Sequence, residues 1–431
     1  MIVYCSSITP RFRYILDFVG RELLGKPFLL TESKEELSGF SGQRINYSQE
    51  RVTENEFWLP PHSLLFEKEI KQQKIDCFEF NKQKAFFKTE GDFPFDIFAA
   101  SFYLLSRYEE YLPHKKDMYG RYAHENSLAF NNDFLNLPLV NIWLEDLKKY
   151  LIQKFPFLTI HHSPFTFLPS YDIDEAYSFK YKSWWRTAGG YARSLINGNL
   201  KDTNKRLHVS SGKVPDPYDS FSWMDQLHEK YSLTPRYFFL VAFKSGKYDK
   251  NISPSKQQMQ NLIINHAKKY NIGIHPSWQS GDDPEKLKLE ILKLGHVAGK
   301  QVLSSRQHYI RFTLPGTFRL LIDAGIESDY SMGYGSINGF RASVASSFYW
   351  YDLEKEQQTN LMVYPFCFME ANSFFEQKFS PEQALDEMYH YREIIKSVNG
   401  TMITIWHNTF LGTGELFAGW REVYEQFISE L

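Results

Sequence analysis

The sequence predicts an α/β protein with two units: a smaller α+β domain over residues 1–160 and a fold of parallel β/α units over residues 165–431. Three observations support this. A chain of 431 residues is too long for one ordinary core, because single cores usually stop growing at about 250–300 residues. From about Phe165 onward, short apolar runs alternate with longer amphipathic stretches, as strands alternate with helices in parallel folds. Ionisable residues follow several of these apolar runs.

The first unit mixes strand-like runs with one helical pattern. Strands are predicted at residues 1–5, 57–59 and 77–80, and a helix at residues 95–111. In that helix the apolar residues recur at helical spacing after Pro94, and charged residues follow at its end. We interpret it as a core helix with a solvated end, and nothing in residues 1–160 predicts a function for this domain.

The second unit is predicted to alternate strands with helices along its whole length. The expected strands lie at residues 167–174, 234–243, 271–277, 301–309, 361–366 and 401–408, and the expected helices at residues 220–231, 255–270, 284–296, 314–324 and 381–397. No internal repeat or low-complexity tract interrupts the series. Alternation of this kind is typical of a parallel sheet covered by helices.

Composition and charge exclude several classes of protein. A hydrophobic share of 43% with 23% charged residues is typical of a folded globular chain. The formal net charge of -2 argues against nucleic acid as a partner, because affinity for a polyanion needs a concentrated basic face. No run reaches the roughly 20 apolar residues that span a bilayer, so no membrane span is expected. The oligomeric state is left open.

The cysteines and the N-terminus predict a cytoplasmic protein. Cys5, Cys77 and Cys367 are odd in number and lack CxxC spacing, so neither a disulfide framework nor a thiolate metal site is expected. The first residues, MIVYCSSITPRFRYIL, contain no basic region followed by an uninterrupted apolar one, as a secretory signal would. A reducing compartment is the simpler interpretation.

Ionisable side chains follow four of the predicted strands. They are Asp172 and Asp174, then His275, then Arg306 and His308, and finally His407. In a β/α barrel the active site lies at the carboxyl ends of the strands, where such residues would meet. One example alone is more often a locally paired loop residue, but four in chain order favour a functional site.

The segments SYDID, GIHPS, SRQHY and TIWHN, in this order, resemble the successive motifs of the polysaccharide deacetylases, the NodB-homology carbohydrate esterases. The likeness covers the chain from about Phe165 to the end. DYSMGYGSINGFRAS followed by VYPF further resembles a bacterial subgroup that carries an extra N-terminal domain. The resemblance implies a distorted parallel (β/α) barrel and a metal-dependent hydrolase that removes N-acetyl groups from amino-sugar-containing saccharides or their precursors.

The resemblance also implies a role for each motif residue. Asp172 would be the base that deprotonates the attacking water, with Arg306 keeping it ionised. His407 would be the general acid for the leaving amine. Asp174 and His275 would bind one divalent metal, for which we expect zinc. The backbone N–H near Tyr309 would share the developing negative charge with the metal.

One departure from the family pattern concerns the metal ligands. The second motif normally supplies two histidines four residues apart, and here His275 is followed at that spacing by Gln279. We expect His308 to replace the missing ligand. The alternatives are another oxygen donor, such as Glu175, or no metal at all.

Other functions are also compatible with parts of this sequence pattern. A catalytically inactive carbohydrate-binding or scaffolding protein would retain the barrel without turnover, and a glycosidase would use the Asp172 and Asp174 pair but leave the histidines unexplained. Trp184, Trp185 and Trp223 could stack on sugar rings, although aromatic residues in a chain this rich in Phe and Tyr more often serve packing. The sequence does not name the sugar.

Overall fold

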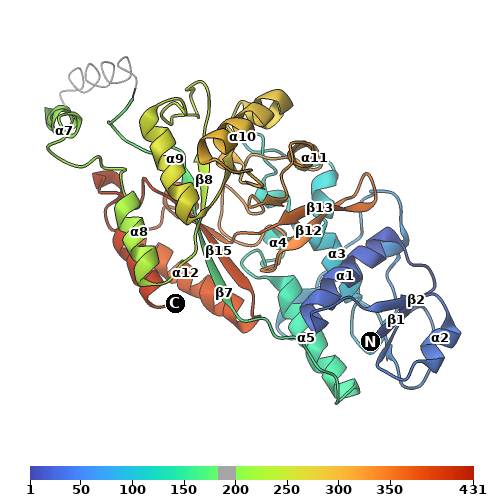
Figure 1. The fold of residues 1–431 in the computed structure, drawn as a ribbon. Coiled ribbons are helices and arrows are strands. Elements are labelled where there is room, and N and C mark those ends of the chain that lie inside the picture. The colour runs from blue at the N-terminus through green and yellow to red at the C-terminus, as the bar shows by residue number, and fades with distance from the viewer. Residues whose placement is uncertain (183–199) are drawn as a thin grey trace.

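The computed structural model describes residues 1–182 and 200–431, in which a small sheet and a large sheet lie side by side (Figure 1). Trp184 and Trp185 lie outside the described residues. In Figure 1 the blue N-terminal sheet is on the right, and the green-to-red strands of the large sheet lie nearer the centre. Among the described residues, the structure contains no helix with the length and apolar character that a membrane crossing requires.

The N-terminal part is built on a four-stranded parallel sheet in the order β2-β1-β3-β4, with β5 and β6 forming a separate antiparallel hairpin. The strands predicted at residues 1–5, 57–59 and 77–80 are present. Helices α1 and α5, which the sequence analysis did not predict, pack beside α3. The elements are β1 (Ile2–Cys5), α1 (Pro10–Leu24), β2 (Leu29–Thr31), α2 (Lys34–Gly39), β3 (Arg44–Tyr47), β4 (Phe57–Trp58), β5 (Phe78–Phe80), β6 (Gln83–Ala85), α3 (Ile97–Leu105), α4 (Leu128–Asn131) and α5 (Leu139–Lys154).

The C-terminal part contains a curled nine-stranded sheet in the order β12-β13-β11-β10-β9-β8-β7-β15-β14. Every pairing is parallel except that of β12 with β13. The sheet forms half a barrel, because no pairing joins β12 to β14 among the described residues. The elements are β7 (Thr166–Ile173), α7 (Leu200–Ser210), α8 (Phe221–Lys230), β8 (Arg236–Leu240), α9 (Gln257–Lys269), β9 (Asn271–His275), α10 (Pro284–Ala298), β10 (Ser304–Ser305), α11 (Gly316–Asp323), β11 (Ser328–Asp329), β12 (Phe348–Asp352), β13 (Gln357–Val363), β14 (Phe368–Met369), α12 (Pro381–Ser397), β15 (Thr401–His407) and α13 (Trp420–Ser429).

The predicted α/β fold class is confirmed by this sheet. Strands β7, β8, β9 and β15 and helices α8 to α12 lie where the apolar runs and amphipathic stretches predicted them. The strand predicted at residues 361–366 overlaps β13 only at residues 361–363, and the one predicted at residues 301–309 is reduced to the two residues of β10. Local sequence also explains their ends: Pro284 follows the capping residue Asp283 at the start of α10, and Gly299 ends that helix in a left-handed conformation. The short strands β11 and β14 and the antiparallel β12 were not predicted.

One part of the N-terminal prediction is wrong, because the helix expected over residues 95–111 does not continue into a solvated end. Helix α3 ends at Leu105, and Arg107 adopts a left-handed conformation with φ of 53°. This turn lets the buried Arg107 side chain donate to Glu109 and Glu110, both at 2.8 Å. The charged residues are therefore inside the protein and pair with one another.

Glu110 joins the two parts of the chain through a buried ion network. Its two carboxylate oxygens accept hydrogen bonds from Arg341 at 2.8 and 2.6 Å, and Arg341 also donates to the carbonyl of Gly333. The Arg341 guanidinium lies over the rings of Tyr122, Phe312 and Tyr334, which belong to one hydrophobic cluster with members from Val3 to Ile428. Burial raises the pKa of Glu110, but Arg341 and Arg107 lower it to about 2.

Replacement of Glu110 by glutamine is expected to lower the free energy of unfolding by about 3–5 kcal/mol, because removing one partner leaves a buried charge uncompensated. Since the folded-state pKa lies below the usual value, the stabilisation by Glu110 is present above about pH 4.5 and is lost as the pH falls toward about 2. Urea unfolding at several pH values measures both effects. Glu125→Gln, on a side chain 62% exposed, is the matched control and should change stability by less than about 0.5 kcal/mol.

Candidate metal and catalytic site

Strand register brings the ionisable residues of the four motifs together. Asp172 at the end of β7 pairs with His407 at the end of β15, and His275 at the end of β9 pairs with Leu240 of β8. The backbone N–H of Arg306 donates to the carbonyl of Ile274 at 3.0 Å, which places the third motif beside the second. Five of the six predicted site residues line one cavity of about 470 Å³, and they are Asp172, Asp174, His275, His308 and His407. The sixth, Arg306, lies behind Asp172.

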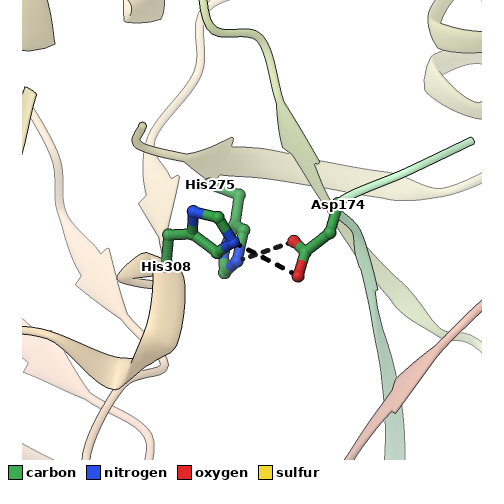
Figure 2. A group of neighbouring side chains, drawn as sticks. All are labelled: Asp174, His275 and His308. Carbon is green, nitrogen blue, oxygen red and sulfur yellow. Dashed lines mark ion pairs between the residues drawn. The ribbon is translucent and has the colours of Figure 1, made fainter. Parts of the chain in front are cut away.

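Asp174, His275 and His308 form a group that could hold a metal ion (Figure 2). The two rings lie beside one another and the Asp174 carboxylate faces both, with Oδ1 at 3.1 Å from His275 Nε2 and Oδ2 at 3.3 Å from His308 Nε2. One ligand atom from each residue lies within 4.8 Å of the others. His308, from the third motif, is thus the second histidine of this group.

Hydrogen bonds at the outer ring nitrogens orient both histidines. His275 Nδ1 lies 2.7 Å from the carbonyl oxygen of Arg306, which can only accept, so Nδ1 carries the proton and Nε2 presents a lone pair. His308 Nδ1 lies 3.3 Å from Asp249 Oδ1 and is oriented in the same way. Asp174 Oδ1 is buried without a hydrogen-bond partner among the described residues. An oxygen and two imidazole nitrogens left in this state fit the donor set of a divalent cation.

Asp174 and His308 shift each other's pKa values. Burial raises the pKa of Asp174, but His308 and His275 hold it well below its usual range. Burial lowers the pKa of His308, whereas Asp174 and Asp249 raise it to about 9. Without a bound cation His308 would therefore carry a proton at neutral pH, and a metal ion would displace that proton, because it binds the neutral imidazole.

Asp172 and Arg306 form a buried ion pair beneath the metal-ligand group. Arg306 Nη1 donates to Asp172 Oδ1 at 2.8 Å, and the same guanidinium donates to Ser170 Oγ and to the carbonyl of Tyr330. The ring of Phe238 lies 4.3 Å from its central carbon. Asp172 is 2% exposed, and its Oδ2 lies 3.8 Å from His275 Nε2. The guanidinium therefore fixes one oxygen of Asp172 and leaves the other directed toward the cavity.

His407 is held by a buried carboxylate that the sequence analysis missed. Both its Nδ1 and its backbone N–H contact Glu370 Oε1, at 2.6 and 2.8 Å, while Nε2 lies 3.5 Å from Asp174 Oδ2. Burial lowers the pKa of His407, but Glu370 and Asp174 raise it well above the usual value. Glu370 follows the apolar run FCFM of β14, so the rule that found the other residues would also have found it.

Several other residues named from the sequence lie apart from the metal-ligand group. Glu175 lines the cavity but forms an ion pair with Lys182, and Gln279 is exposed. Trp223 lies under the guanidinium of Arg421, at 4.1 Å, on a helix that covers the sheet. Asp249, which orients His308, was missed because it lies in a loop and follows no apolar run directly.

Comparison with known proteins finds a family model that matches the N-terminal part and solved structures with a distant likeness. Residues 1–156 match a model described as a family of unknown function, DUF7033. No curated protein matches the chain. Among solved structures, a protein from Mycobacterium smegmatis described as a polysaccharide deacetylase is 12% identical over 63% of this chain and 84% of its own, with a TM-score of 0.39.

Two further structures are similar to the same degree. A protein from Pseudomonas aeruginosa PAO1, also described as a polysaccharide deacetylase, is 12% identical over 62% of this chain and 84% of its own, with a TM-score of 0.39. An allantoinase is 12% identical over 62% of this chain and 83% of its own, with the same TM-score. Likenesses this distant carry no argument about activity, so a function for this chain rests on its own residues.

Proposed function

We propose that the protein is a metal-dependent hydrolase that removes N-acetyl groups from amino-sugar-containing saccharides or their precursors. The observation that carries the proposal is the convergence of three sets of groups on one cavity: the Asp174, His275 and His308 cluster, the Asp172–Arg306 pair, and the Glu370–His407 pair. Amide hydrolysis needs a polarised carbonyl, a base for water and an acid for the leaving amine. The metal-ligand group would serve to polarise the carbonyl, Asp172 would be the base and His407 would be the acid.

Asp174, His275 and His308 would hold the metal, and zinc suits one carboxylate and two imidazoles. When bound, a divalent ion supplies Lewis-acid activation of water and of the amide carbonyl. The chain would present one carboxylate and two histidines to the ion in a fixed orientation. Asp249 and the carbonyl of Arg306 do this by holding the outer nitrogens of the two histidines.

Asp172 would act as the base. Its Oδ1 is held by Arg306, so Oδ2 is the oxygen that can take a proton from the attacking water. The water oxygen then adds to the acetyl carbon. The hydrogen bond from Arg306 would hold the base in a fixed orientation.

His407 would act as the acid. Its Nδ1 is engaged by Glu370, and its Nε2 is directed into the site. As the carbon–nitrogen bond breaks, the Nε2 proton would pass to the departing nitrogen, giving a free amine and acetate. The raised pKa of His407 suits this role, because the group must carry its proton before the bond breaks.

The proposal is tested by release of acetate from N-acetylglucosamine oligomers, using protein stripped of metal and then supplied with Zn²⁺. We expect release that depends on added metal and that is absent with fully deacetylated oligomers. Binding of the oligomers without turnover under any divalent metal would instead support an inactive carbohydrate-binding protein. Acetate release that proceeds equally in the stripped protein would contradict the metal-dependent mechanism.

Replacement of Asp249 by asparagine is expected to weaken metal binding about 10- to 100-fold, because a carboxylate behind a ligating histidine fixes its tautomer and raises its basicity. Competition with a chromophoric zinc chelator measures the affinity without any assay of activity. Asp282→Asn, on a side chain 75% exposed, is the matched control and should leave the affinity unchanged. Equal affinities of Asp249→Asn and the parent would show that His308 needs no such support or is not a ligand.

Two further parts of the proposal concern organisation and location. We propose that residues 1–160 and 165–431 are separate domains joined through the shared core. We also propose a cytoplasmic location, which is supported by the free thiols of Cys5, Cys77 and Cys367. An N-acetylated saccharide precursor made in that compartment would then be the natural substrate.

A further inference from the structure

The N-terminal part of the chain supplies one wall of the cavity. A tight turn over residues 116–122, closed by a bridge between Lys116 and Tyr122, places Tyr119 and Arg121 among the residues that line it. The sequence of residues 1–160 predicts no function. This turn is the place where that part of the chain comes into contact with the catalytic residues proposed above.

Arg121 anchors the turn directly to the third motif. Its Nη1 donates to the carbonyl oxygen of Tyr309 at 2.8 Å, while Asp117 holds its Nε at 2.6 Å. The guanidinium passes over Gly335, where an added Cβ would lie only 2.0 Å from Nη1, so glycine is needed for this approach. Because Asp117 balances the charge of Arg121, the turn offers the cavity an aromatic surface and not an anion site.

Tyr119 belongs to a cluster of four aromatic rings beside the metal-ligand group. Its ring centroid lies 5.3 Å from that of Tyr309 and 6.2 and 6.3 Å from those of Trp278 and Tyr248. Tyr309 follows His308, and these two rings are 4.6 Å apart. Tyr119, Tyr248 and Tyr309 all line the cavity and are half-buried. The cluster therefore begins at a proposed metal ligand and extends away from it along the wall.

A buried amide group lies in the same wall. Gln307 is 3% exposed and lines the cavity, and its side-chain nitrogen has no hydrogen-bond partner among the described residues. Burying a polar group without a hydrogen-bond partner costs free energy, so the unpaired nitrogen of Gln307 points to a ligand atom that accepts its hydrogen bond. A hydroxyl or carbonyl oxygen of a saccharide would accept a hydrogen bond from the Gln307 side-chain nitrogen.

We propose that Tyr119, together with Tyr248, Tyr309 and Gln307, forms a subsite that binds an uncharged sugar ring next to the sugar whose acetyl group is removed. The inference rests on the proposed function, since it assigns the neighbouring ring of the same substrate. Aromatic rings offer a large rigid surface with little loss of conformational entropy, and the apolar face of a pyranose ring can pack on it. Residues 116–122 thus make the N-terminal part a determinant of substrate length.

The test is binding of N-acetylglucosamine and of its tetramer to the metal-loaded full-length protein, measured by calorimetry. Tyr119→Ala is expected to weaken tetramer binding roughly 3- to 10-fold, the ratio that one aromatic contact commonly supplies, and to leave monomer binding unchanged. Tyr119→Phe should bind as the parent does. Met118→Ala, on the 87% exposed neighbour in the same turn, is the matched control and should have no effect.

Three results would overturn the subsite: a parent protein that does not prefer the tetramer, an equal loss for monomer and tetramer in Tyr119→Ala, or no loss for either. The proposed reaction is judged separately, by acetate release. Binding that depends on Tyr119 in a protein that releases no acetate would keep the subsite and reject the reaction. Acetate release with unchanged binding by Tyr119→Ala would keep the reaction and reject the subsite.

Discussion

Replacement of Asp172 by asparagine is expected to lower kcat for acetate release by about 10²–10⁴-fold, the contribution typical of a positioned general base. The asparagine side chain has nearly the same shape and still offers Arg306 an oxygen at the position of Oδ1. It cannot accept a proton from water at the position of Oδ2. The loss should therefore appear in kcat, with little change in KM.

The variant is informative because Asp172 lies outside the metal-ligand group. Metal content of Asp172→Asn should equal that of the parent, and Asp323→Asn, at an exposed position on α11, is the control for loss of a carboxylate elsewhere in the domain. Circular dichroism and thermal unfolding establish that the variant is folded. A folded, metal-loaded Asp172→Asn protein that keeps most of the parent kcat would show that another group, such as Glu175, takes the proton.

The sequence predicted the part of the site that depends on strand ends. Asp172, His275 and His407 each follow a buried apolar run, and parallel pairing with little shift in register brings such ends to the same edge of a sheet. Glu370 obeys the same rule, so its omission was a failure to apply the rule to the short run FCFM. Local sequence pattern and parallel topology were sufficient to predict that these residues lie at the same edge of the sheet.

The remaining contacts of the cavity, and the buried ion network around Arg107, depend on tertiary contacts that no local sequence pattern encodes. Asp249 reaches His308 from a loop, and Arg121 reaches Tyr309 across 188 positions of the chain. Arg107 breaks the predicted helix because its charge is satisfied only by the buried glutamates that follow it and by the packing around Arg341. Each of these depends on the tertiary fold, which periodicity and propensity do not specify.

In the N-terminal part, the sequence contains start and end signals for helix α1 that the prediction did not use. Helix α1 begins after Thr9, whose side chain accepts from the backbone of Phe12, has Pro10 in its first turn, and ends at Gly25 in a left-handed conformation. A capping residue, an early proline and a final glycine are the usual marks of a helix. The parallel pairing of β1 with β2 follows from this helix, because a helical crossover is what joins neighbouring parallel strands.

The metal-ligand group gives the other large expected effect. Purified parent protein, exposed to divalent metals and freed of unbound ions, should retain about one equivalent of zinc, as a site with three protein ligands does. Asp174→Ala should retain none, because Asp174 is the only carboxylate of the group and faces both histidines. Glu175→Ala is the matched control: its side chain is paired with Lys182, and it should bind as the parent does.

His308→Ala is the sharper variant, because it separates the two interpretations of the third ligand. If His308 replaces the histidine that the family places at the position of Gln279, this substitution should abolish binding as fully as His275→Ala does. Full binding by His308→Ala combined with loss in Glu175→Ala would instead assign the third position to an oxygen donor. A folded parent that retains no metal would contradict the assignment of Asp174, His275 and His308 as ligands and would favour the inactive carbohydrate-binding protein.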